Sequence, residues 1–352
     1  MRRRMSANDV IILFGGTSDE RRVSVASAQN VATVLPEAEV WFQAPDGSVT
    51  PCPRATLAAH QNAYTTDLQL PGTARWPSLD AALDAGEARG KTFFLALHGG
   101  QGEDGTTQRA LERRGLAFTG SGSEASAKGF DKERAKALAA KAGVRTVESV
   151  ELTGDAGAML SALQGLLARH GRLVVKPIRG GSSVGLYHVK GPEDAGRAAR
   201  EVAAQAPQVA FLAEAFVQGT ELTVGVVDSL DGKRRALPCS EVRVDPGRAF
   251  DFEGKYLGKG TLELTPAEVP PDVFQAAQAL AVTAHEALGC EGYTRTDIIV
   301  GARGPVYLET NTLPGLTKAS FIPQQLAAEG TALRPFLEEQ LALARARRDR
   351  QR

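Results

Sequence analysis

The chain has 352 residues, which is too long for a single small hydrophobic core. Its composition is that of an ordinary globular protein. Basic and acidic residues both number 41, so the zero formal net charge excludes a strongly basic surface for nucleic acid or acidic membranes. The cysteines are few and widely spaced, polar residues follow the basic start, and no apolar run reaches the ~20 residues of a membrane span. We therefore expect a cytoplasmic protein with no nucleic-acid or membrane partner.

An open parallel sheet is predicted for the first 120 residues. The apolar run Val10–Phe14 ends in two glycines and precedes a helical pattern over Val23–Leu35. A second such run, Phe93–Leu97, ends in His-Gly-Gly and precedes a helix over Thr107–Arg114. Alternating strands and helices are typical of parallel sheets, whose ligands gather at the carboxyl ends of the strands. Both glycine-rich turns are therefore expected to border a binding site.

The remaining chain mixes helices and strands. Asp131 is a good N-cap for a helix that runs to Ala142. The stretch Asp245–Thr265 is rich in glycine and predicts a functional loop, and the basic tail Arg345–Arg352 is interpreted as a frayed, solvated helix end. The other predicted elements are the strands Leu173–Lys176 and Gly185–Val189, the segment Val209–Phe216, the strand Thr220–Val227 and the helix Pro271–Leu288.

Two alternating strands, Tyr293–Val300 and Val306–Asn311, predict a hairpin around the turn-rich stretch 301–305. A five-residue loop would pair Val300 with Val306. The same register places Asp297 opposite Glu309 and Arg295 opposite Asn311, whereas a four-residue loop would turn these side chains to opposite faces.

Two facing carboxylates repel each other, so Asp297 and Glu309 need a cation or a shared proton. The oxygen atoms of Asp297, Glu309 and Asn311 suit a hard ion such as Mg²⁺ beside substrate phosphates. The alternative is a solvated acidic face on which Arg295 is a salt-bridge partner.

A lysine-bearing strand followed by a Gly/Ser loop, Val174–Gly185, indicates a phosphate site. Small residues let backbone N–H groups approach phosphate oxygens, and Lys176 adds a positive charge. The stretch is not a Walker A loop, because no Gly-Lys-Ser/Thr closes it.

Taken together, the motifs resemble those of D-alanine–D-alanine ligases of the ATP-grasp superfamily in order and approximate spacing. The resemblance implies an α/β fold with an N-terminal α/β domain (1–120) and two α+β lobes (121–218 and 219–352) that sandwich ATP. The matching stretches cover most of residues 10–325 and are Phe14–Val25, Leu97–Thr107, Thr119–Lys132, Val175–Leu186, Glu214–Val224, Glu253–Leu262 and Tyr293–Phe321.

The resemblance also implies roles for individual residues. The positions that match ATP contacts are Lys132, Lys176, Ser182, Ser183, Glu214, Val217, Glu221 and Lys255. The positions that match ligands of two Mg²⁺ ions, with Mn²⁺ as a substitute, are Asp297, Glu309 and Asn311. The positions that match the amino-acid and catalytic sites are Glu20, His98, Ser182, Tyr256, Arg295, Gly315, Ser320 and Phe321.

From the residues alone, three of these roles have equally simple explanations. Glu20 is as well explained by the favourable dipole at a helix N-terminus. His98 is also typical of a packed turn histidine, and Tyr256 of an aromatic that anchors a loop.

The implied activity is ATP-dependent joining of two D-alanines through an acyl phosphate, for peptidoglycan precursors, by a homodimer. Arg22 stands where family members commonly carry a second carboxylate, and Lys318 and Phe321 replace smaller or aliphatic residues, so the amino-acid specificity stays open. Tyr256 favours D-alanine over D-lactate as second substrate. The alternatives are a ligase for other amino or hydroxy acids and an inactive nucleotide-binding regulator. A dehydrogenase is disfavoured, because Gly15–Ser18 lacks the G-x-G-x-x-G spacing.

Overall fold

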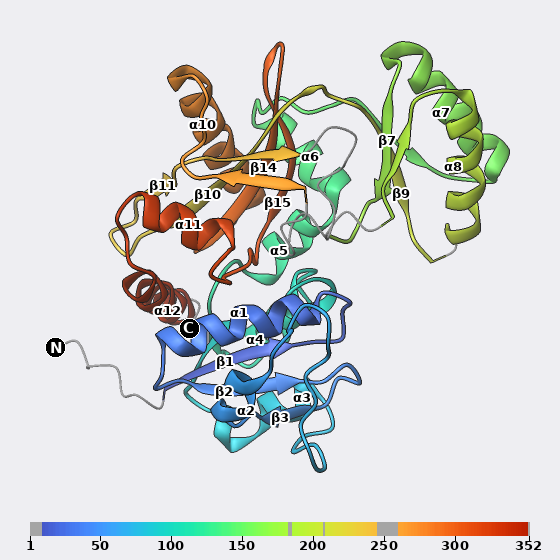
Figure 1. The fold of residues 1–352 in the computed structure, drawn as a ribbon. Coiled ribbons are helices and arrows are strands. Elements are labelled where there is room, and N and C mark those ends of the chain that lie inside the picture. Colours follow the sequence, from blue (N-terminus) through green and yellow to red (C-terminus); the bar gives the residue numbers. More distant parts are fainter. Residues whose placement is uncertain (1–8, 182–184, 207, 245–259, 351–352) are drawn as a thin grey trace.

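Three β-sheets follow one another along the chain in the computed structural model, each flanked by helices (Figure 1). The structure describes residues 9–181, 185–206, 208–244 and 260–350. Ser182, Ser183, Lys255 and Tyr256, which were given roles by resemblance, lie outside the described residues. Across the described part of the chain, no helix is long and apolar enough to cross a membrane.

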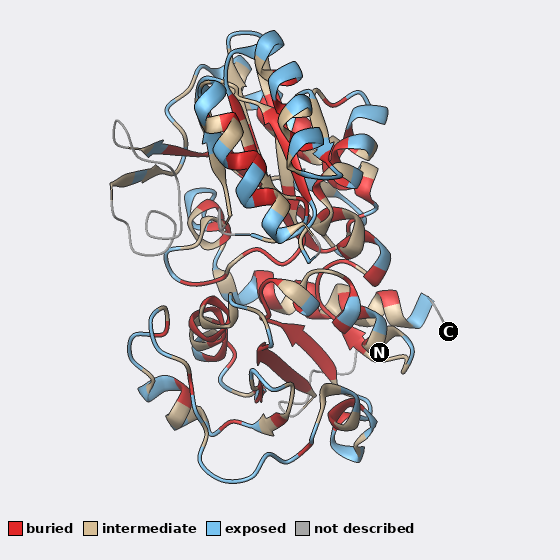
Figure 2. Ribbon diagram, turned by 90° about the vertical axis from the view of Figure 1, so that its right-hand side faces the viewer, coloured by how far each residue is buried: buried red, intermediate tan, exposed pale blue. Residues whose placement is uncertain are grey.

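The first sheet has the strand order β3-β2-β1-β4-β5, and only β3 is antiparallel to its neighbour. The predicted open parallel sheet is therefore confirmed. Its strands lie between layers of helices, and Figure 2 shows them as buried. The strands are β1 (Val10–Gly15), β2 (Glu39–Gln43), β3 (Val49–Pro51), β4 (Thr92–Leu95) and β5 (Ala117–Phe118), and the helices are α1 (Arg21–Val34), α2 (Arg54–Ala59), α3 (Leu79–Asp84) and α4 (Thr106–Glu112).

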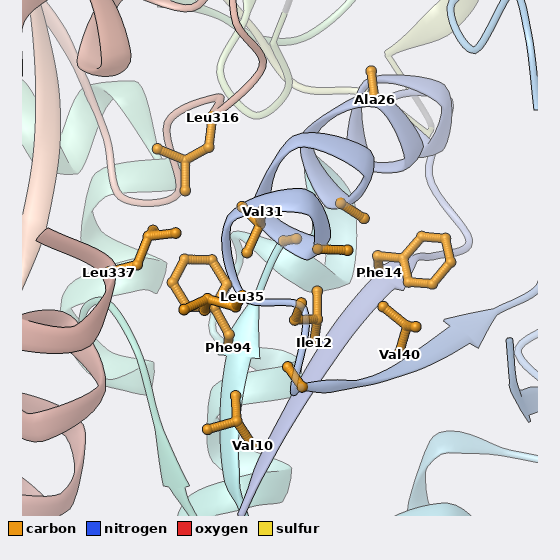
Figure 3. Packing of buried hydrophobic residues seen from close by; sticks show 14 of the residues in the cluster. Val10, Ile12, Phe14, Ala26, Val31, Leu35, Val40, Phe94, Leu316 and Leu337 are labelled. Atoms are coloured by element: carbon orange, nitrogen blue, oxygen red, sulfur yellow. The ribbon is translucent and has the colours of Figure 1, made fainter. Parts of the chain in front are cut away.

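Strand β1 is apolar throughout because both of its faces are buried. Val10, Ile12 and Phe14 pack beneath α1, whereas the alternate residues belong to a second cluster on the other face. Figure 3 shows that Leu316 and Leu337, from the far end of the chain, approach the same cluster. Hydrophobic packing therefore ties the first sheet to the C-terminal part of the protein.

The second sheet is antiparallel and has the order β6-β9-β7-β8. Helix α6 begins where Asp131 predicts, since the Asp131 side chain accepts a hydrogen bond from the Arg134 backbone N–H at 3.1 Å. The strand predicted from Gly185 begins at Tyr187. The elements are α5 (Ser123–Phe130), α6 (Lys132–Lys141), β6 (Ser149–Leu152), α7 (Ala156–His170), β7 (Leu173–Pro177), β8 (Tyr187–Val189), α8 (Pro192–Gln205) and β9 (Phe211–Ala215).

The third sheet has the order β13-β12-β10-β14-β15, with β11 beside β10. The loop prediction for Asp245–Thr265 is wrong at its C-terminal end, because residues 261–264 form β13 and pair with β12; residues 245–259 lie outside the described part. The elements are β10 (Gly219–Asp228), β11 (Arg234–Ala236), β12 (Ser240–Val244), β13 (Thr261–Leu264), α10 (Pro271–Leu288), β14 (Tyr293–Gly301), β15 (Gly304–Asn311), α11 (Phe321–Ala328) and α12 (Leu333–Arg350).

The basic C-terminal helix is ordered to Arg350 and packed up to residue 348, so the prediction of a frayed, solvated end is wrong over residues 345–348, whereas residues 349 and 350 are exposed. Helix α12 lies against β4 and β5 of the first sheet. Arg347 is buried, donates to the carbonyl oxygens of Phe118 and Gly120, and lies 3.2 Å from a Glu291 carboxylate oxygen. A helix end that looks solvated by composition is here anchored by carbonyls from a distant strand.

Candidate active site

At its charged residues, the acidic hairpin has the register that was predicted from a five-residue loop. Asp297 pairs with Glu309, and Arg295 pairs with Asn311. The prediction for the turn is wrong, because Val300 pairs with Pro305 and Gly301 with Gly304, so that the loop has two residues instead of five. A register shift between Asp297 and Ile298 leaves one extra residue on β15 and restores the pairing at the site.

That β-bulge determines which way the acidic side chains point. Ile298 pairs with Tyr307 and Asp297 with Glu309, so Leu308 is the extra residue. Without it, Leu308 would face the same side as Asp297, and Glu309 would turn toward the buried layer that contains Tyr307. Bulges commonly re-aim side chains beside functional sites. Here the bulge aims Glu309 into the cleft.

The Asp297 carboxylate is held from two sides. Arg295 donates to both of its oxygens at 2.9 Å, and the Thr223 hydroxyl on β10 donates at 2.7 Å. The salt bridge proposed as the alternative explanation of Arg295 is therefore present. It coexists with the second carboxylate, Glu309, on the neighbouring strand.

Two lysines, Lys132 on α6 and Lys176 on β7, interact with the carboxylates of the hairpin, which we call the acidic floor (Asp297 and Glu309). The Lys132 ammonium lies 3.5 Å from the Glu309 carboxylate and donates to the Gly180 carbonyl at 2.6 Å. Burial alone would lower the pKa of Lys176, but the carboxylates of Glu214, Glu309 and Asp297 outweigh it and raise that pKa. The lysines and the acidic hairpin therefore form one electrostatic unit.

Glu214 is a buried carboxylate between two lysine ammonium groups. Its oxygens lie 2.8 Å from Lys136 and 2.8 Å from Lys176. Burial raises the pKa of Glu214, and the two lysines outweigh burial and hold that pKa below its usual value. Lys136 was not predicted as a site residue, although its position one helical turn after Lys132 on α6 was a usable signal.

Glu20 reaches the cleft from the first turn after β1. A β-carbon added to Gly99 would lie 2.5 Å from a Glu20 carboxylate oxygen, and one added to Gly181 would lie 2.9 Å from it. The Glu20 carboxylate therefore occupies the space between Gly99 and Gly181, and a side chain at either position would displace it. Gly99 also has a φ of +64°, which favours glycine there.

His98 connects the first sheet with the segment after β15. Its Nε2 lies 2.9 Å from the Ser27 hydroxyl, and that hydroxyl accepts the Leu316 backbone N–H at 3.3 Å. Glu103 lies beside it and accepts the Gly99 backbone N–H at 3.0 Å. Both the packed-turn explanation of His98 and its predicted place at the site are compatible with this position, because His98 lines the cleft.

The segment after β15 is tightly folded around Gly315. A β-carbon there would lie 2.7 Å from the Ser320 hydroxyl, which itself contacts the Thr317 backbone N–H at 3.1 Å. Phe321 begins α11 and lines the cleft. Lys318 is exposed and does not line it, so of these two unusual residues Phe321 alone borders the cleft.

One cleft gathers most of the predicted residues that the structure describes, and its empty space, including the part open to solvent, is about 1170 Å³. Lys176, Glu214 and Val217 are not among its lining residues, and Lys176 and Glu214 pair with each other at 2.8 Å. Lining residues that sequence reasoning missed are Tyr64, Glu103, Thr223 and Glu263. The predicted residues that line it are Glu20, His98, Lys132, Glu221, Arg295, Asp297, Glu309, Asn311, Gly315, Ser320 and Phe321.

The donor set of the hairpin suits a hard cation. Within the described ranges, no group of three or more His, Cys, Asp or Glu side chains is arranged to hold a metal ion. The predicted ligands are different in kind, since they are two carboxylates and one amide, all oxygen donors on paired strands. Asp297, Glu309 and Asn311 therefore fit Mg²⁺ by chemistry, and the pair of ions stays a prediction.

Comparison with known proteins gives one family over nearly the whole chain. Residues 9–121 match the family described as D-ala D-ala ligase N-terminus, and residues 141–341 match D-ala D-ala ligase C-terminus. A D-alanine–D-alanine ligase of Mycolicibacterium gilvum is 35% identical over a gapped alignment of 364 positions, which covers 96% of this chain and 97% of that protein.

Solved structures agree with this assignment. The VanG D-Ala:D-Ser ligase from Enterococcus faecalis is 25% identical, with a TM-score of 0.76 over 96% of this chain and 99% of that one. The D-alanine–D-alanine ligase from Coxiella burnetii shares the fold, with 24% identity and a TM-score of 0.77 over 97% of this chain and 95% of that one. The chain therefore has the ATP-grasp fold and belongs to the D-alanine–D-alanine ligase family.

Proposed function

We propose that the protein joins two D-alanine molecules into D-alanyl-D-alanine while ATP becomes ADP and phosphate. The observation that carries this proposal is the single cleft in which three parts of the chain meet. Glu20 comes from the first sheet, Lys132 from the helices of the second, and Arg295 with its acidic neighbours from the third. The family assignment supports the same chemistry.

Activation of the first D-alanine is needed because a free carboxylate is a poor acyl donor. One of its carboxylate oxygens attacks the γ-phosphorus of ATP, ADP leaves, and an acyl phosphate forms. Lys132 and Lys176 supply the positive charge that faces the triphosphate. Glu214, Glu221 and the backbone of Val217 hold the adenine and ribose in this proposal, as the family resemblance implies.

Peptide-bond formation follows at the acyl carbon. The amine of the second D-alanine attacks, the resulting tetrahedral intermediate expels phosphate, and the amine loses a proton to the departing phosphate or to water. Arg295 and the Gly315 backbone N–H stabilise the developing oxyanion. Glu20 pairs with the ammonium group of the first D-alanine, and His98, Ser320 and Phe321 border the bound amino acids.

Asp297, Glu309 and Asn311 would hold Mg²⁺, which would neutralise phosphate charge when bound. Asp297 has a second role that the geometry makes concrete. Because it accepts both N–H groups of the Arg295 fork, it sets the plane in which the guanidinium meets the substrate.

The proposed setting follows from the substrates. ATP and D-alanine are cytoplasmic metabolites, and the dipeptide product enters peptidoglycan synthesis, on which cell shape depends. We further propose a homodimer and the boundaries 1–120, 121–218 and 219–352 for the three domains. Sedimentation and limited proteolysis test these two statements.

The decisive experiment measures ADP release with Mg-ATP and a panel of D-amino and D-hydroxy acids, with mass spectrometry of the products. We expect D-alanine alone to support turnover and to give the dipeptide. The structural similarity to a D-Ala:D-Ser ligase makes D-serine the most informative competitor. A chain that ligates D-alanine only to another acceptor would replace the named activity with that of a sister ligase, and absence of any turnover would favour the inactive regulator.

A further inference from the structure

Two arginines follow Glu20 directly at the start of α1, and both hold the same aspartate. Arg21 donates to the two Asp67 carboxylate oxygens at 3.0 and 2.9 Å. Arg22 donates to the same oxygens at 2.9 and 3.5 Å. One carboxylate about 45 residues further along the chain therefore accepts from two guanidinium groups. Arg21 also donates to the Ser18 carbonyl oxygen at 3.1 Å and lies 3.7 Å from the exposed Asp19 carboxylate.

The arrangement is electrostatically unusual for a helix start. The start of a helix favours negative charge, and Asp19 and the N-cap Glu20 supply it, but the first turn of α1 itself has no acidic residue and begins with two cations. Without Asp67, Arg21 would keep its contacts with Asp19 and the Ser18 carbonyl, but Arg22 would lose the carboxylate that holds its guanidinium. Arg22 stands two residues after Glu20, to which the proposed function assigns a substrate ammonium. A guanidinium within a few ångströms would compete with that ammonium for Glu20 and repel it.

Asp67 is well suited to prevent this competition. The hydrogen bonds from Arg21 and then Arg22 hold the pKa of Asp67 at about 2 despite the opposing effect of burial, so it is ionised at any physiological pH. Charge-assisted bonds to a guanidinium fork also fix direction as well as distance. The two arginine heads are thereby drawn to Asp67, while the Glu20 side chain lines the cleft between Gly99 and Gly181.

The segment that carries Asp67 has an anchor of its own. Ala63 and Leu68 are buried in the hydrophobic cluster beneath α1, and Tyr64 packs against that cluster and also lines the cleft. Loss of the Asp67 charge therefore leaves the apolar attachment of the segment intact. This separates an electrostatic role of Asp67 from a purely structural one.

We propose that Asp67 is a positioning residue for the first amino-acid substrate, because it holds the Arg21 and Arg22 guanidinium groups away from Glu20 and so preserves the ammonium site. This inference rests on the proposed function and adds to it a residue outside the cleft. It also explains how this chain accommodates Arg22 next to an ammonium-binding carboxylate.

The test compares Asp67→Asn with a triple variant, Arg21→Gln/Arg22→Gln/Asp67→Asn, in steady-state assays of ADP release. We expect Asp67→Asn to raise the Michaelis constant for the first D-alanine roughly tenfold, as the release of a nearby charge of this size predicts. The Michaelis constant for ATP should stay within about twofold. The triple variant should return to near the wild-type value, because it lacks the competing cations, and Asp67→Glu should retain most of the wild-type affinity.

Arg21→Gln/Arg22→Gln serves as the matched control and should bind D-alanine normally. A triple variant no better than Asp67→Asn would overturn the inference, since the aspartate would then act by holding its segment. An unchanged Michaelis constant in Asp67→Asn would overturn it too, while wild-type turnover would leave the proposed function standing. Wild-type protein that releases no ADP with D-alanine would instead refute the proposed function, and the inference with it.

Discussion

Two aspartates on neighbouring strands of the third sheet, Asp297 and Asp228, show how a site differs from a structural ion pair. Their side chains are about equally buried, with 13% and 15% exposed. Each is gripped by an arginine fork, Arg295 in one case and Arg234 in the other. Burial and pairing alone therefore do not distinguish them.

The difference lies in the charge that surrounds each pair. Asp228 also accepts the Gly292 backbone N–H at 3.0 Å, and His285 lies 3.6 Å away, so donors surround one carboxylate. Asp297 instead faces a second carboxylate, Glu309, across the hairpin, in a cleft that Lys132 also lines. Two carboxylates on facing strands repel each other and attract cations, here Arg295 and Lys132, so this clustering of charge in a cleft marks the functional end of the sheet.

The largest expected effect is that of Asp297→Asn on catalysis. The change removes a proposed metal ligand and weakens the grip on Arg295, so turnover should fall about a thousandfold or more. Melting temperature should move by only a few degrees, since the amide keeps the shape of the side chain. Turnover within tenfold of the wild type would contradict the assignment, and Asp228→Asn, in the same sheet, is the matched control for activity.

The second prediction concerns the buried group in which Glu214 lies between Lys136 and Lys176. Lys136→Met leaves Glu214 with one of its two cations, and we expect a loss of about 3 kcal/mol in unfolding free energy. The Michaelis constant for ATP should rise roughly tenfold, because Glu214 is the proposed nucleotide contact. Urea unfolding and ATP titration measure the two effects.

Lys128→Met is the control for this prediction. Lys128 forms an i,i+4 pair with the exposed Glu124 on α5, at 2.8 Å, and solvent screens exposed pairs of this kind, so its loss should change stability little. Equal losses of unfolding free energy in Lys136→Met and Lys128→Met would contradict the prediction, because the buried ion pair with Glu214 would then stabilise the protein no more than an exposed pair.

The smallest expected effect is that of Asp228→Asn, which should act on stability alone. Although burial raises the pKa of Asp228, the nearby His285 and Arg234 hold it at about 2. A carboxyl whose pKa is lower in the folded protein stabilises it above the unfolded pKa, near 4, and loses that contribution as pH falls toward 2. We expect the wild type to exceed the variant by about 2 kcal/mol at neutral pH.

That difference should shrink as the pH is lowered from 4 to 2, and ligase activity at neutral pH should be unchanged. Chemical unfolding at several pH values measures it. A stability gap of the same size at pH 2 and pH 7 would assign the effect to packing instead of charge.

Sequence alone determined those features that depend on local pattern. The continuous apolar run of β1 predicted a strand buried on both faces, and Asp131 predicted the start of α6. Alternation in β14 and β15 put Arg295 with Asp297, and Glu309 with Asn311, on one face of each strand, and the order of motifs indicated the family. These features depend on the side-chain periodicity of helices and strands and on residue type, and both can be seen in the local sequence.

Tertiary structure decided the rest, because it depends on residues far apart in sequence. The turn is shorter than predicted, and the extra residue Leu308 compensates for it, so that Asp297 still pairs with Glu309. Nothing in the alternation of the sequence indicated this extra residue. Arg347 looks solvated until the carbonyls of Phe118 and Gly120 surround it, and the role of Lys136 depends on Glu214, 78 residues away. Asp67 likewise matters only because folding brings it to two arginines. The sequence supplies the charged side chains, and long-range packing decides which of them form structural ion pairs and which line the cleft.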